Sequence, residues 1–201
     1  MHLDNKLLFS THINYICNKI SIGQGIIYSL SHYLPTKILL SLYYTLIYPH
    51  INLNIVIWGG TSESRLKKVR VAMNNVFRSI LSIGRDENNI PNRCNNYLYK
   101  TLNVLKFDDV YLTNMILFIH SILYGQNSNL FYDFIGRHLP QHRYGTRNSR
   151  LNIPSIRLKI EKQSTFYNTI KIFNDMPPEF LEPQSRHSLK KKCKVLALQN
   201  Y

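Results

Sequence analysis

Asp108 and Asp109 are adjacent in the chain, and paired carboxylates are the groups with which an enzyme could hold two metal ions. His138 and His142 are four residues apart, a spacing that could place two imidazoles on one helical face for zinc. Pro140 interrupts that histidine pair, and no Cys or Glu completes a ligand set. The two aspartates fit a helix start, with Asp108 as the cap and Asp109 near the positive end of the helix dipole. The sequence thus gives no positive sign of catalysis or of a bound metal.

An aromatic residue surrounded by arginines is more informative. Tyr144 is flanked by Arg143, Arg147 and Arg150 in a segment without helical periodicity. Guanidinium groups in such a segment suit backbone phosphates, and the ring suits stacking on a base. A solvated loop that binds nothing is equally consistent with these residues.

The charge balance points to the same kind of partner. The 201 residues contain 25 Lys and Arg against 11 Asp and Glu, a formal net charge of +14. The last sixty-five residues hold +9 of this charge, including the run Lys190 to Lys194. Such a balance favours a polyanionic partner or an acidic membrane surface. The lysine run alone is weaker, because it could also be a solvated helix face or a nuclear targeting signal.

Several classes are excluded. The N-terminus has no apolar stretch long enough for a signal peptide, so secretion is not expected. The most apolar run, Ile38 to Trp58, contains Pro49 and polar residues that hydrocarbon would penalise, so we expect no membrane span. The three cysteines, Cys17, Cys94 and Cys193, are widely separated in the sequence. They therefore fit a protein of a reducing compartment, nuclear or cytoplasmic.

The elements that must position these residues are mainly α-helices, because the apolar residues recur every three to four positions. The clearest helix is expected to run from a cap at Thr61 to about Ser82, with a polar face opposite one apolar stripe. Its stripe comprises Leu66, Val69, Met73, Val76, Phe77 and Ile80. A second clear helix, rich in lysine, is expected to start at Ser185.

Other elements are less regular. We expect a helix capped by Ser10 or Thr11 that kinks or breaks near Gly23, and another, capped by Thr36, that ends at Pro49. Residues 51–58 fit a strand or a short helix equally well.

Two further helices, one capped by Asn92 and one by Asp108, would complete a bundle-like core. Residues 136–164 form an irregular basic connection. We therefore expect a helical domain at 1–135 and a basic extension at 136–201, with an irregular loop and a terminal helix.

Taken in order, several segments resemble one family. They are LDNKLLFSTHI (3–13), LYYTLIYP (42–49), VIWG (56–59), the helix of residues 66–80, HRYGTR (142–147), FNDMP (173–177) and SLKKK (188–192). These resemble the family segments "LGV..D..L.F..HI", "LYysLIyP", "vWG", "L..lQ.kaiR.i", "H.YnTR", "WNsLP" and "sFKkklK". The family is the reverse transcriptases of non-LTR retrotransposons, the LINE-like and jockey-like elements. In the last two segments, Phe173 replaces a tryptophan and Leu189 a phenylalanine.

The resemblance implies a thumb and C-terminal region without the catalytic palm. The family's catalytic paired Asp lies in a "YxDD" hairpin upstream of the matching region. Lys106-Phe107-Asp108-Asp109 does not replace it, because Lys106 stands where the aromatic belongs. The chain alone is therefore expected to be inert and to hold no cofactor, whereas the intact polymerase would need magnesium.

The implied partner is RNA or an RNA/DNA template-primer, with no membrane and no small-molecule substrate. The expected phosphate contacts are Lys67, Lys68, Arg70, Arg143, Arg147, Arg150, Lys190, Lys191 and Lys192, and Tyr144 could stack on a base. The alternative is a helical protein-interaction or structural module, in which the basic residues only keep the bundle soluble.

Overall fold

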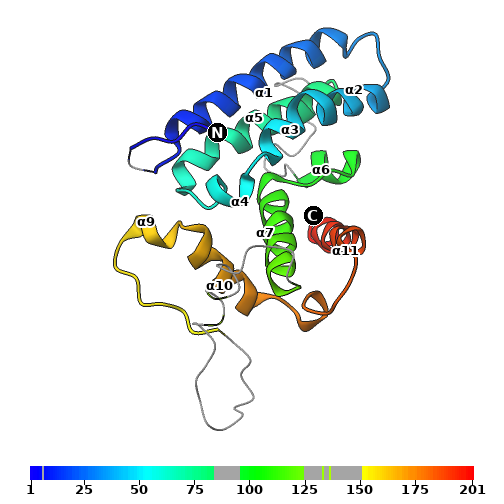
Figure 1. Ribbon diagram of the computed structural model, residues 1–201. Helices are drawn as coiled ribbons and strands as arrows, with labels where there is room; N and C mark the ends of the chain where they lie inside the picture. Colours follow the sequence, from blue (N-terminus) through cyan, green and yellow to red (C-terminus); the bar gives the residue numbers. More distant parts are fainter. Residues whose placement is uncertain (6, 84–95, 125–132, 134–135, 137–150) are drawn as a thin grey trace.

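The computed structural model describes residues 1–201 except 6, 84–95, 125–132, 134–135 and 137–150 (Figure 1). The described residues contain helices and no strand, which confirms the mainly α fold. The elements are α1 (Ser10–Leu30), α2 (Thr36–Leu42), the π-helical turn η1 (Tyr43–Ile47), α3 (Tyr48–Asn52), α4 (Ile55–Trp58), α5 (Glu63–Ile80), α6 (Asn96–Leu102), α7 (Phe107–Leu123), α9 (Lys159–Lys162), α10 (Thr165–Asp175), the 3-10 turn η2 (Pro178–Phe180) and α11 (Arg186–Gln199). None of these helices is both long and apolar enough to cross a membrane.

Helices α1 and α5 pack side by side and form the larger core (Figure 1). The predicted stripe of α5 is confirmed, because all six of its residues are buried. Helix α1 contributes four buried isoleucines to the same cluster, Ile13, Ile16, Ile20 and Ile27. Each such side chain stabilises the fold by about 1.5–3 kcal/mol relative to its exposed state. The polar face of α5 is therefore turned away from this core.

Of the kink or break expected near Gly23, the break is wrong, since α1 continues to Leu30. Gly23 is buried, and a Cβ atom at this position would lie 2.5 Å from Cγ1 of Ile47. Because Gly23 has no Cβ, η1 can approach α1 closely at this point. The packing of Ile47 against Gly23 compensates for the weak helix propensity of glycine.

The expected helix end at Pro49 is also wrong. The backbone N–H of Tyr48 donates to the carbonyl of Tyr43, five residues earlier, which makes a π-helical turn just before the proline. Pro49 then lies at the start of α3, where its missing N–H is not needed. Residues 51–58 are helical, with a turn between α3 and α4 at Asn54, whose φ of 53° asparagine tolerates.

Several predicted caps differ from the structure. The residues before α2 and α5 are Pro35 and Ser62 instead of the predicted caps Thr36 and Thr61, and the predicted cap Asn92 lies outside the described residues.

Two further differences from the predicted caps involve carboxylates. The residue before α1 is Phe9, and the Asp4 carboxylate accepts from the N–H groups of Leu8 and Ser10 at 2.6 and 3.1 Å. The residue before α7 is Lys106, so Asp108 lies in the first turn instead of capping it. Both changes keep a carboxylate near the free N–H groups of a helix start, where it is favourable.

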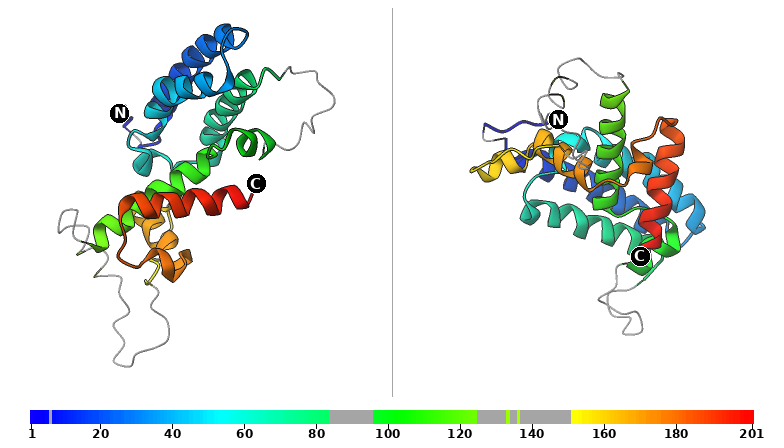
Figure 2. Two further views of the ribbon diagram at one scale, coloured as in Figure 1. Left: turned by 90° about the vertical axis from the view of Figure 1, so that its right-hand side faces the viewer. Right: turned by 90° about the horizontal axis from the view of Figure 1, so that it is seen from below.

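The C-terminal elements surround the second half of α7. Ile116 and Leu117 of α7 form a cluster with Phe180, Leu189 and Cys193. Figure 2 shows α11 alongside α7, as their contacts also indicate. A third cluster joins α7 to α10 and to the segment that precedes α9. Only isolated residues are described around the predicted domain boundary at 135/136, which stays a prediction.

Cap residues explain the starts of two C-terminal helices. The predicted start at Ser185 is confirmed, because its hydroxyl accepts from the N–H of Ser188 at 3.2 Å. Helix α10 was not predicted, although Ser164 caps it in the same way by accepting from Tyr167. Such serine caps satisfy N–H groups that a helix leaves unpaired.

Tyr201 fastens the end of the chain to the start of α7. Its hydroxyl donates to the Asp109 carboxylate and accepts from the backbone N–H of Lys106 at 2.8 Å. The Lys106 ammonium lies 3.9 Å from the centroid of the Tyr201 ring, within the range of a cation–π contact. Asp109 is therefore engaged in holding the fold.

Candidate nucleic-acid interface

Lys67 and Lys68 lie on the polar face of α5 and are exposed. They are positioned by the buried stripe, whose spacing turns these two positions outward. Lys68 also lies close to α1: burial raises the pKa of the Cys17 thiol, and the charge of Lys68 partly opposes this. The α1–α5 pair thus presents two adjacent ammonium groups to solvent.

Arg70 lies on the same helix, but its charge is already compensated. Its guanidinium donates to the Asp108 carboxylate at 2.6–3.1 Å and also to Glu63. Partial burial disfavours the charged form of Arg70, but these hydrogen bonds outweigh it and raise the pKa of Arg70 above its ordinary value. The arginine thereby ties α5 to the first turn of α7, and a phosphate would have to compete with two carboxylates.

The aspartate pair consequently has a structural use. Both aspartates lie in the first turn of α7. Asp108 accepts a hydrogen bond from Arg70 of α5, and Asp109 accepts one from the Tyr201 hydroxyl. Within the described residues, no three His, Cys, Asp or Glu side chains come together as metal ligands would.

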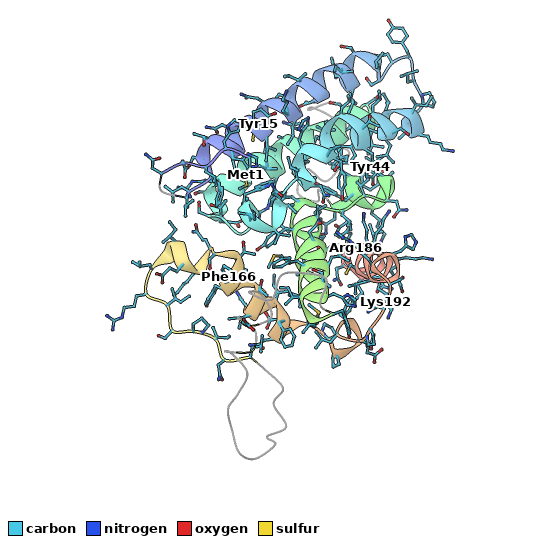
Figure 3. All side chains as sticks on the ribbon, viewed as in Figure 1. Met1, Tyr15, Tyr44, Phe166, Arg186 and Lys192 are labelled. Carbon is cyan, nitrogen blue, oxygen red and sulfur yellow. The ribbon has the colours of Figure 1, made fainter. Side chains whose placement is uncertain are left out.

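The predicted lysine run is divided between two sides of α11. Leu189 and Cys193 are buried against α7, which leaves Lys190, Lys191 and Lys192 exposed. Successive helical residues are rotated by about 100°. Lys191 and Lys192 therefore line a shallow depression beside η2, whereas Lys190 lines a cleft beside η1. Figure 3 labels Lys192 on α11 and Tyr44 on η1.

The predicted arginine segment, the predicted histidine pair and Cys94 all lie outside the described residues. The first two comprise Arg143, Tyr144, Arg147 and Arg150, and His138 and His142. The residue that follows Arg150 is described. Leu151 donates its N–H to the side chain of Asn174 at 2.7 Å and accepts from it at 2.9 Å. This reciprocal pair fixes Leu151 against α10.

Three tyrosines that the sequence analysis did not single out accompany Lys190. Tyr43, Tyr44 and Tyr48 line a cleft of about 250 Å³ with Leu105, Val110, Lys190 and Lys194. The available signal was the clustering of tyrosines in residues 42–49, which by itself fits a packed helix equally well. Only the tertiary structure brings α11 next to them.

No family model, no curated protein and no solved structure matches this chain.

Proposed function

We propose that the chain is the thumb and C-terminal part of a non-LTR retrotransposon reverse transcriptase and that it binds RNA or an RNA/DNA hybrid through backbone phosphates. The proposal is supported by the order of the resembling segments along the chain. The same segments supply central parts of the described structure, including the buried Trp58 and the stripe of α5.

One observation of the structure carries the proposal: the exposed lysines of α5 and α11 form no ion pair with any acidic residue that the structure describes. Both ion pairs among the described residues belong to Arg70. Lys67, Lys68 and Lys190 to Lys192 are exposed and form no ion pair with a described carboxylate, although Glu179 lines the same depression as Lys191 and Lys192. A surface of this kind binds phosphates by releasing their counterions, so its affinity falls as salt rises.

The test is the affinity for labelled single-stranded RNA and for an RNA/DNA hybrid over a range of salt concentrations. We expect tight binding at low salt and a linear fall of log affinity with log salt. Lys67→Gln/Lys68→Gln should reduce the slope for the single strand by about 1.4 units, since each lost contact removes roughly 0.7.

The matched control is Lys37→Gln/Lys171→Gln, which removes the same charge from exposed positions on α2 and α10. This control should retain the slope of the parent chain. Absence of binding at low salt would overturn the proposal and favour the protein-interaction module.

A further inference from the structure

The cleft between η1, α3 and α11 combines aromatic rings with ammonium groups. Tyr44 is 41 % exposed, Tyr48 is half-buried and Tyr43 is buried beneath them. The ring centroids of Tyr44 and Tyr48 lie 5.4 Å apart, and those of Tyr43 and Tyr44 lie 5.1 Å apart. Opposite them, Lys190 and Lys194 are four residues apart, which places them on one face of α11.

The π-helical turn creates this arrangement. Tyr43 and Tyr48 are joined by the five-residue hydrogen bond, so their side chains lie on the same side of the backbone and their rings lie 6.1 Å apart. In a regular α-helix, residues five apart would be rotated away from each other. Such turns are frequent at functional sites.

The charges in the cleft favour an anion. Among the residues that the structure describes, two lysines and no carboxylate line it. Burial raises the pKa of Tyr43 well above its ordinary value, and it also raises the pKa of Tyr44 and Tyr48. All three phenols therefore remain neutral at physiological pH and can donate hydrogen bonds.

The size of the cleft favours part of a polymer. Its volume of about 250 Å³ lies below the ~300–1,000 Å³ of pockets that enclose whole drug-sized ligands. Aromatic faces bind bases without sequence preference, and only unpaired bases have free faces.

We propose that this cleft binds one nucleotide unit of a single strand, with its base against the rings of Tyr44 and Tyr48 and its phosphate between Lys190 and Lys194. The inference rests on the proposed function, to which it adds a binding position and a preference for unpaired bases. An acidic peptide would use the lysines but would gain little from the rings.

The test compares two fluorescent oligonucleotides of about twelve residues, a length within the site sizes of single-strand binders. One is oligo(dT) and the other is an abasic chain of the same length. Tyr44→Leu should weaken the binding of oligo(dT) about tenfold and leave that of the abasic chain unchanged. The control Tyr33→Leu, at a tyrosine that is 83 % exposed outside the cleft, should change neither.

The lysines are tested on the same probes. Lys190→Gln/Lys194→Gln should weaken both oligonucleotides and reduce the salt slope by about 1.4 units. Lys37→Gln/Lys171→Gln should retain the parent slope. A measurement without substitutions uses oligonucleotides that carry 5-iodouracil, which should crosslink under light to the peptide containing Tyr44 and Tyr48.

The outcomes separate this inference from the proposed function. If the parent chain binds in a salt-dependent way but Tyr44→Leu affects both probes equally or neither, the inference is wrong and the proposed function stands. Crosslinks confined to other peptides would overturn it as well, even if Tyr44→Leu did not fold. If the parent binds single-stranded RNA or the RNA/DNA hybrid but neither oligonucleotide, the inference is wrong and the proposed function stands. If it binds none of these nucleic acids at low salt, both proposals fail.

Discussion

At the scale of single residues, Gly23 and Gly25 share one helix but differ in their surroundings. A Cβ at Gly23 would lie 2.5 Å from Ile47, whereas a Cβ at Gly25 would meet nothing within 4 Å. Alanine increases helix propensity by about 1 kcal/mol at either site. At Gly23, overpacking costs about 1–3 kcal/mol and should outweigh this gain. We therefore expect Gly23→Ala to lower, and Gly25→Ala to raise, the urea midpoint of unfolding. Equal shifts would contradict the close approach of η1 to α1.

Arg70 should make the stability depend on pH. The hydrogen bond from Arg70 holds the pKa of Glu63 below its ordinary value. The stabilisation is therefore complete above the pKa of the unfolded glutamate and is lost as the pH falls through the lowered folded pKa. Glu63 is 80 % exposed, so the contribution is at most about 1 kcal/mol.

Arg70→Gln should remove this contribution, and its free energy of unfolding should fall less between pH 7 and pH 3 than that of the parent chain. Urea unfolding at the two pH values measures the difference. The same fall in both proteins would show that the ion pair adds nothing to stability.

At the scale of elements, α5 offers the sharpest contrast between its two faces. Val76 is 0 % exposed, while Lys68 is exposed on the same helix. Val76→Asp should destabilise the fold by about 3 kcal/mol or more, because it buries a charge without a partner. Lys68→Asp should change stability by about 0.5 kcal/mol or less. Equal urea midpoints for the two variants would rule out the observed orientation of α5.

Periodicity was sufficient to predict α5, and the cap Ser185 was sufficient to predict the start of α11, because these signals lie in the local sequence of each helix. The predictions of a helix break at Gly23 and of a helix end at Pro49 were wrong because packing and backbone geometry outside the local pattern decide the structure at both positions. Propensity weighs a residue in isolation, whereas Ile47 packs on Gly23 and a π-helical turn accommodates Pro49. Helix α10 was missed although Ser164 signals its start.

The sequence likewise predicts only the part of the candidate interface that depends on a single helix. The exposure of Lys67 and Lys68 follows from the stripe of α5. The engagement of Arg70 does not, since Asp108 is 38 residues away in sequence. The cleft beside Tyr44 depends on where α11 packs, and local sequence carries no information about that.

At the scale of the whole molecule, the basic residues belong to parts that α7 joins. Its first half packs into the α1–α5 core, and its second half packs against α10 and α11. Two described lysine surfaces, on α5 and α11, are thereby held on one scaffold. The final sixty-five residues carry +9 of the net charge of +14, part of it between Arg143 and Arg150. Combining substitutions in these surfaces and measuring whether their effects on the salt slope add up shows whether one strand contacts several of them.

The last prediction uses the arginine segment. Replacing Arg143, Arg147 and Arg150 by Ala should reduce the salt slope for single-stranded RNA by about 2 units, at roughly 0.7 per phosphate contact. Tyr144→Ala should instead weaken binding by about 1–3 kcal/mol through lost stacking and leave the slope unchanged. If one strand spans the segment and α5, adding Lys67→Gln/Lys68→Gln to the triple variant should reduce the slope further, by the full amount of the lysine pair alone. A triple variant with the parent's affinity and slope would show that the segment is a solvated loop, and its charge would then serve solubility.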